Sequence, residues 1–255
     1  MKLLTALRAE LLKTKRTSSL YFTLATAALV PAIFLLNVLT NGGDVAAIGK
    51  DPLNTIFKLG AERTGLVFFP LFVILVCTLL AQIEYRNNTW KQVLAAPQKK
   101  RNIFLAKFLN INLLILLFLA ANLLLTALVA VVTHFMNPSL HVLQHSFNWT
   151  RLFTRTANTY VTMLALCTFQ FWLALRFRSF IVPTGVGFAL WFTGMMMSFE
   201  FQSSLVDYFP YSFQAFPFIP DFQSKMTQIN LTSLGYATVF LLLGFLDFRK
   251  RRLTS

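Results

Sequence analysis

The stretch EYRNNTWKQVLAAPQKKRNIFLAK, residues Glu84 to Lys107, is a polar interruption between two long apolar runs. We call it the polar segment, and its charged residues are Glu84, Arg86, Lys91, Lys99, Lys100, Arg101 and Lys107. The chain of 255 residues is 56% hydrophobic and 13% charged, whereas a soluble domain carries about 25% charged residues. A water-soluble fold of this size could not bury so much apolar surface, so the composition indicates a membrane protein.

Six apolar runs are long enough to cross a bilayer, which requires about 20 mostly apolar residues for a hydrocarbon core of about 30 Å. They cover approximately residues 18–39, 64–83, 108–133, 156–175, 180–199 and 229–246. The run 108–133 is so long that we expect its helix to tilt or protrude. The sequence therefore predicts an all-α integral membrane protein in which residues 1–255 form a single transmembrane domain.

The charges in alternate loops predict the orientation. One side holds 17 Lys and Arg residues and three acids, and the other holds six of each sign. The net charge of +14 thus lies on one side, which the positive-inside rule assigns to the cytoplasm. We expect both termini and the polar segment to be cytoplasmic, with membrane lipids attracting the same cations. Because these cations lie between apolar runs and not on one polar face, they argue against nucleic-acid binding.

Two segments outside the spans have patterns of their own. Residues 1–17 gather leucines on one side of a helical wheel, which predicts an interfacial helix, with a short frayed extension as the alternative. Residues 200–228 place Pro210, Pro217 and Pro220 among aromatic residues, too apolar for a free loop and too broken for a span. We expect a re-entrant segment covered by protein, and a compact aromatic cap is the alternative.

The six spans contain no Asp, Glu, Lys, Arg or His. Because ion-coupled transporters usually need such groups near the midplane, this composition argues against a self-powered secondary transporter. We expect the polar side chains within the spans to bridge helices, with cargo contact as the alternative; these are Asn110, Asn112, Asn122 and Gln170. Cys77 and Cys167 fall in separate apolar runs, far from any Cys or His in the sequence, and we interpret them as packing residues.

No catalytic, cofactor or metal site is indicated. The stretch GGDVAAIGKD, residues 42–51, lacks the spacing and the Ser or Thr of a phosphate loop, and neither GxSxG nor HExxH occurs. His134, His141 and His145 have no Cys or carboxylate among them, so an amphipathic surface turn competes with metal binding. An intramembrane enzyme would have only Glu62, Glu200 or His134 to use.

Within the polar segment, NNTWKQVLAA has a helix start and ends before Pro97. This predicts a short helix across the membrane face whose apolar side chains, Trp90, Val93 and Leu94, fit a groove on another protein.

At EYRNNTW the sequence resembles the ABC type-2 export permeases, and within them the lantibiotic and bacitracin self-protection subunits. Pro97, the basic run before Lys107, the six spans and the broken aromatic segment extend the resemblance over almost the whole chain. In that family two permease subunits, identical or different, associate in the bacterial plasma membrane. Each docks on a separate cytoplasmic ATPase through a coupling helix.

The resemblance implies a non-catalytic permease subunit, with the polar segment as its coupling segment. Residues at or beside the ATPase contact would be Glu84, Arg86, Thr89, Trp90 and Lys91, joined by the apolar Val93 and Leu94. Asn88 stands where the family usually has Gly. The cargo would be amphipathic or lipophilic, for example a peptide antibiotic, and no residue is assigned to bind it. A membrane scaffold that recruits a cytoplasmic partner without transport is the competing hypothesis.

Overall fold

The computed structural model describes residues 3–15, 17–41, 51–95, 98–200 and 204–250. Its regular elements are all helical, which confirms the expected all-α class. The α-helices are α1 (Leu3–Lys15), α2 (Ser19–Asn41), α4 (Pro52–Arg63), α5 (Phe69–Arg86), α6 (Trp90–Ala95), α7 (Lys100–Met136), α8 (Trp149–Arg176), α9 (Ile181–Phe199) and α10 (Met226–Lys250). A π-helical turn, η1 (Thr64–Phe68), joins α4 to α5. Short 3-10 helices are η2 (Pro138–Leu140), η3 (Val142–Gln144), η4 (Ser204–Tyr208), η5 (Phe213–Ala215) and η6 (Pro220–Lys225).

Six helical stretches within the described residues are long and apolar enough to cross a membrane. They are Ser19–Thr40, Pro52–Arg86, Lys100–Met136, Trp149–Arg176, Ile181–Phe199 and Pro220–Lys250. Several extend beyond the apolar runs of the sequence, because helices continue through polar residues outside the hydrocarbon. The longest is α7, whose 37 residues make a rod about 55 Å long.

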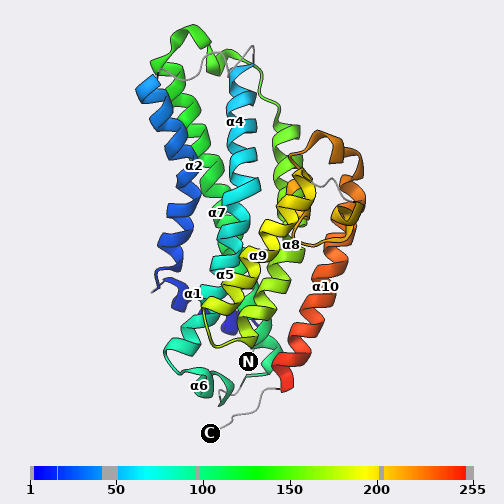
Figure 1. The fold of residues 1–255 in the computed structure, drawn as a ribbon. Helices are drawn as coiled ribbons and strands as arrows, with labels where there is room; N and C mark the ends of the chain where they lie inside the picture. Colours follow the sequence, from blue (N-terminus) through cyan, green and yellow to red (C-terminus); the bar gives the residue numbers. More distant parts are fainter. Residues whose placement is uncertain (1–2, 16, 42–50, 96–97, 201–203, 251–255) are drawn as a thin grey trace.

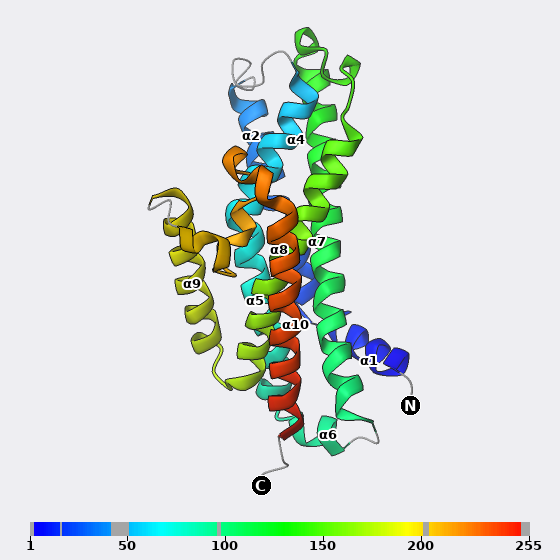
Figure 2. The same cartoon turned by 90° about the vertical axis from the view of Figure 1, so that its right-hand side faces the viewer.

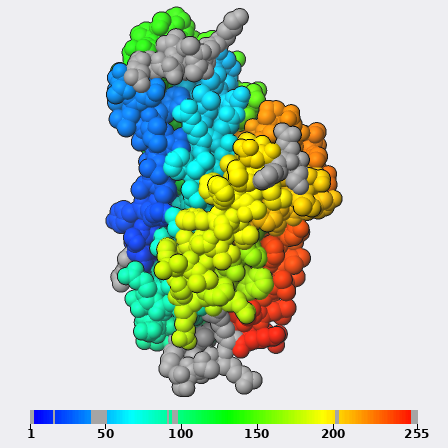
Figure 3. Space-filling model, viewed as in Figure 1, coloured from blue at the N-terminus to red at the C-terminus, as the bar shows by residue number. Residues whose placement is uncertain are grey.

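The helices form an elongated bundle (Figure 1). α6, the start of α7 and the end of α10 lie at one end, which we call the α6 end, and α1 lies across the bundle beside it (Figures 1 and 2). α5 and α8 are the most enclosed spans, whereas α2, α9 and α10 turn most of their side chains outward. α9 crosses the face seen in Figure 3 obliquely. The exposed residues of the outer spans are mainly large apolar ones, as expected for contact with lipid.

The polar residues inside the spans bridge helices, as predicted. Asn122 Nδ2 donates to the carbonyl of Ala27 at 2.9 Å, and Gln170 Nε2 donates to the carbonyl of Pro183 at 2.8 Å. Asn112 Oδ1 accepts from the Tyr160 hydroxyl at 2.9 Å. Such bonds satisfy polar groups that lipid could not satisfy.

The segment between α9 and α10 folds back among the helices (Figure 2). Every residue from Tyr211 to Phe218 is buried, and the Tyr211 hydroxyl donates to Gln170 Oε1 at 3.0 Å. The segment approaches its neighbours so closely that glycine is required. A Cβ on Gly65 would lie 2.1 Å from Phe218 Cζ, and one on Gly194 would lie 2.4 Å from the Tyr211 carbonyl oxygen. Protein therefore covers this broken segment, which is compatible both with a re-entrant segment and with a compact aromatic cap.

Cys77 and Cys167 are both buried, and their Sγ atoms are 4.0 Å apart across the contact between α5 and α8. Both are free thiols within the hydrophobic core, which agrees with their interpretation as packing residues. The residues are 90 positions apart in the chain, and only the packing of these two helices brings them together.

Candidate functional site

The polar segment forms a compact turn between two spans. α5 ends at Arg86, and the Thr89 amide donates to the carbonyl of Glu84 at 3.0 Å, which closes the turn before α6. Asn88 has φ 51°, the left-handed conformation. Glycine reaches this conformation without a steric penalty, and Asn is among the residues that tolerate it best. The Gly-to-Asn difference from the resembled family is thus compatible with the turn.

The predicted site residues divide into an inner and an outer group. Glu84 is 1% exposed, and Trp90 and Val93 are half-buried and pack against the main core. Arg86 is exposed and Thr89 is half-buried. The side chains of Lys91 and Leu94, like Pro97 as a whole, lie outside the described residues. The outward surface of the turn and helix consists of Arg86, Asn87, Asn88 and Gln92, followed in the chain by Lys99 and Arg101.

Trp90 anchors α6 to the bundle. Its ring lies 5.4 Å from the Tyr85 ring and 5.9 Å from the Phe248 ring, measured between centroids. The Lys107 Nζ atom lies 5.5 Å from the centroid of the Trp90 ring, within the range of a cation–π contact. The Tyr85 hydroxyl donates to the Leu175 carbonyl, so the turn is also attached to the end of α8.

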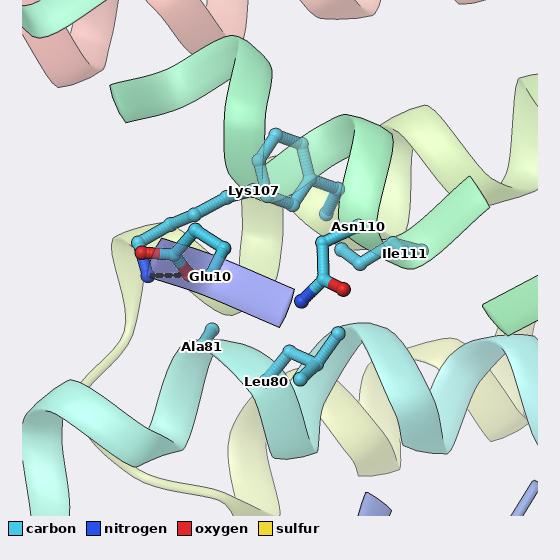
Figure 4. Close-up of a pocket in the computed structure, with 7 residues that line it drawn as sticks. Glu10, Leu80, Ala81, Lys107, Asn110 and Ile111 are labelled. Carbon is cyan, nitrogen blue, oxygen red and sulfur yellow. Dashed lines mark hydrogen bonds and ion pairs between the residues drawn. The ribbon is translucent and has the colours of Figure 1, made fainter. Parts of the chain in front are cut away.

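Behind this turn lies a buried cluster of four charged residues, which we call the ionic cluster: Glu10, Lys13, Glu84 and Lys107. Lys107 Nζ lies 2.9 Å from Glu10 Oε2 and also donates to Glu84 Oε1. Lys13 Nζ lies 2.7 Å from Glu10 Oε1 and 3.0 Å from Glu84 Oε1. The cluster therefore connects α1, α5 and α7 at the α6 end, with two charges of each sign. Figure 4 shows its pair of Glu10 and Lys107.

The electrostatics of α1 follow from this arrangement. Burial raises the pKa of Glu10, but attraction by Lys107 and Lys13 outweighs burial, so the pKa lies below its ordinary value of 4.5. Burial lowers the pKa of Lys13, but attraction by Glu10 and then Glu84 outweighs it, so the pKa lies above 10.5. Both groups are held in their charged forms at neutral pH.

The sequence interpretation missed Glu10 and Lys13 as site residues and treated Lys107 only as part of a basic run. α1 buries Ala6, Glu10 and Thr14 and exposes Leu4 and Leu12, so its polar stripe contacts protein. A signal was present in the sequence. The predicted cytoplasmic side carries only three acids, and all three form ion pairs in the structure: Glu10, Glu84 and Asp247.

The histidines and the remaining predicted positions form no such group. His134 is half-buried near the end of α7, and His141 is exposed with φ 45°. In the part of the chain that the structure describes, no three His, Cys, Asp or Glu side chains come together as metal ligands would.

A sequence-family model described as ABC-2 family transporter protein matches residues 6–194. The match covers about three quarters of the chain and includes the polar segment and the whole ionic cluster. No curated protein matches the chain. Together with the six candidate spans, this match shows that the chain belongs to the ABC-2 transporter family, as a multi-pass membrane permease of the kind that works with an ATP-binding-cassette subunit.

Proposed function

We propose that this chain is the membrane subunit of an ABC exporter, which moves an amphipathic or lipophilic compound across or out of the membrane while a separate ATPase supplies the energy. Family membership and the six spans support a permease. The observation that carries the proposal is the polar segment, because a short helix with an outward polar surface and an inward ionic attachment suits the transmission of force. A peptide antibiotic is our proposed cargo, in line with the self-protection subunits that the sequence resembles.

The ATPase contact is proposed at the polar segment, at the residues assigned from the sequence: Glu84, Arg86, Thr89, Trp90, Lys91, Val93 and Leu94. We divide these residues according to their exposure. Arg86 and its exposed neighbour Gln92 would meet the ATPase, while Glu84 and Trp90 would connect α6 to the bundle from behind. A groove on the ATPase would therefore receive mainly polar and basic side chains.

The membrane setting follows from the charges. The loops with the large basic excess lie at the α6 end, and the positive-inside rule would place that end in the cytoplasm of a bacterial plasma membrane, together with both termini. We propose that two permease copies, identical or different, associate there. The exposed apolar surfaces of α2, α9 and α10 are available for lipid and for that association.

The test is affinity purification in mild detergent from the native host, with identification of co-eluting proteins and an assay of ATP hydrolysis. We expect a soluble ATPase to co-purify, and we expect Arg86→Glu with Gln92→Glu to release it. Both residues are exposed, so the double variant should fold normally. The matched control is Arg151→Glu with Gln144→Glu, the same exchange at exposed positions of the opposite end.

Recovery of the chain with no ATPase, or with a partner that hydrolyses no nucleotide, would refute the proposal and favour a membrane scaffold. An ATPase that both double variants retain equally would refute the placement of its contact.

A further inference from the structure

The ionic cluster joins α1 to the two long helices that flank the polar segment. Glu10 and Lys13 belong to α1, Glu84 ends α5 and Lys107 lies in the third turn of α7. Lys107 and Glu10 are 97 positions apart, yet their charged atoms are 2.9 Å apart. Three leucines of α1, Leu4, Leu11 and Leu12, are exposed, whereas the residues that α1 buries are Ala6, Glu10 and Thr14. Its attachment at this end is therefore largely polar.

Stability alone does not account for a buried cluster of charges. Taking charges out of water is costly, and apolar residues of similar volume often stabilise a protein as well or better. Charged groups are, however, well suited to an attachment that must hold a set geometry, because removing one partner leaves a buried charge unpaired.

A further polar contact attaches α1 to α7. Asn110 lies one turn beyond Lys107 on α7, donates to Thr14 Oγ1 of α1 at 2.6 Å, and lines the same narrow cleft as Lys107 and Glu10 (Figure 4). Glu84 Oε2 and Asn110 Oδ1 are buried and accept no hydrogen bond from the described residues. The polar attachment of α1 thus extends along one turn of α7.

From these contacts we propose that the ionic cluster is a joint through which movement of α6 carries α1 along with α5 and α7, and that Lys107 is its positioning residue. This inference rests on the proposed function, because it assumes that an ATPase moves α6. It makes α1, with its leucines toward lipid, a moving part of the transporter and not a passive membrane anchor.

The test measures distances by spin labelling in the purified complex with its ATPase, reconstituted in nanodiscs. Labels are introduced by Lys15→Cys on α1, Lys99→Cys between α6 and α7 and Arg249→Cys on α10, all exposed positions outside the residues proposed to contact the ATPase. Cys77 and Cys167 remain in place, since both are 0% exposed and thus protected from the label. The probe is ATP with vanadate, so the cargo need not be known.

We expect trapped nucleotide to shift the distance between positions 99 and 249 while the distance between positions 15 and 99 stays constant. In the neutral variant, which combines Glu10→Gln, Glu84→Gln, Lys13→Met and Lys107→Met, we expect the complex to assemble but the 15 to 99 distance to shift as well. The full charge exchange, Glu10→Lys and Glu84→Lys with Lys13→Glu and Lys107→Glu, keeps all four ion pairs attractive and should behave like the wild type. Asp247→Asn is the control, because it breaks the exposed ion pair with Arg176 at the same end.

A neutral variant whose 15 to 99 distance stays as constant as in the wild type would overturn the joint. The joint would also be overturned if that distance shifted in the wild type itself. Failure of any ATPase to co-purify with the wild type is a different result, which would overturn the proposed function and the joint with it.

Discussion

Replacing Gly65 should destabilise the protein, because Gly65 lies in the π-helical turn directly against Phe218 of the segment between α9 and α10. In Gly65→Ala, the new Cβ would lie 2.1 Å from Cζ and 2.2 Å from Cε2 of Phe218. The Phe218 side chain is only 8% exposed, so its ring has little space to move away. Overpacking of a filled core lowers stability by about 1–3 kcal/mol. Because the new Cβ would approach the Phe218 ring so closely, we expect a loss at the upper end of this range. Replacing Gly by Ala in a helix returns up to about 1 kcal/mol, so we expect a net loss of about 2 kcal/mol.

The assay is thermal unfolding of the purified protein in one detergent, where about 2 kcal/mol corresponds to a midpoint lower by about 4–8 °C for a chain of this size. Gly235→Ala is the matched control, because a Cβ there meets nothing within 4 Å, and it should leave the midpoint unchanged or raise it. In the background of Phe218→Ala, which removes the ring, Gly65→Ala should cost almost nothing. If Gly65→Ala unfolded at the same temperature as Gly235→Ala, the close packing of Phe218 against Gly65 would be incorrect.

Three further predictions concern the α6 end. Lys107→Met should lower the free energy of unfolding by about 3 kcal/mol, the lower end of the range for a broken buried ion pair, because Lys13 still contacts Glu10 and Glu84. Adding Glu10→Gln and Glu84→Gln should restore most of the melting temperature, and no recovery would contradict the electrostatic explanation. The Glu10 carboxylate contributes stability that is fully present above pH 4.5 and is lost as the pH falls through its lowered pKa. Glu10→Gln should therefore weaken the fall in melting temperature at acid pH, and an unchanged fall would refute this role. Because the φ angle of Asn88 is 51°, Asn88→Gly should leave the stability unchanged or raise it, and Asn88→Val should lower the free energy of unfolding by about 1–2 kcal/mol. Equal melting temperatures of the two variants would argue against the left-handed turn.

The sequence predicted the helices well because lipid imposes a length and a composition that can be read directly from apolar runs. It also predicted that Asn112, Asn122 and Gln170 bridge helices, since a polar group in hydrocarbon must find a protein partner. The broken, aromatic character of residues 200–228 was enough to indicate a protein-covered segment.

The site was harder to predict because it depends on which helices meet. Nothing near Glu10 in the sequence shows that it will face Lys107, and the apolar pattern of Trp90 and Val93 does not distinguish a contact with a partner from one with the protein's own core. The structure turns both residues inward. The sequence likewise does not predict that Cys77 lies close to Cys167, because this contact depends on how α5 packs against α8.

α7 differs mechanically from the helical stretch that precedes the polar segment. Its 37 residues contain neither proline nor glycine, so it lacks the usual causes of a kink. The stretch Pro52–Arg86 has a π-helical turn and Pro70 within it, and both are typical places for a helix to bend. A tilt of α7 by about 5° at the α6 end would therefore displace its other end by about 5 Å, given its length at 1.5 Å per residue. Of the two helical stretches that flank the polar segment, α7 should therefore move as one stiff rod, whereas Pro52–Arg86 can bend near its π-helical turn.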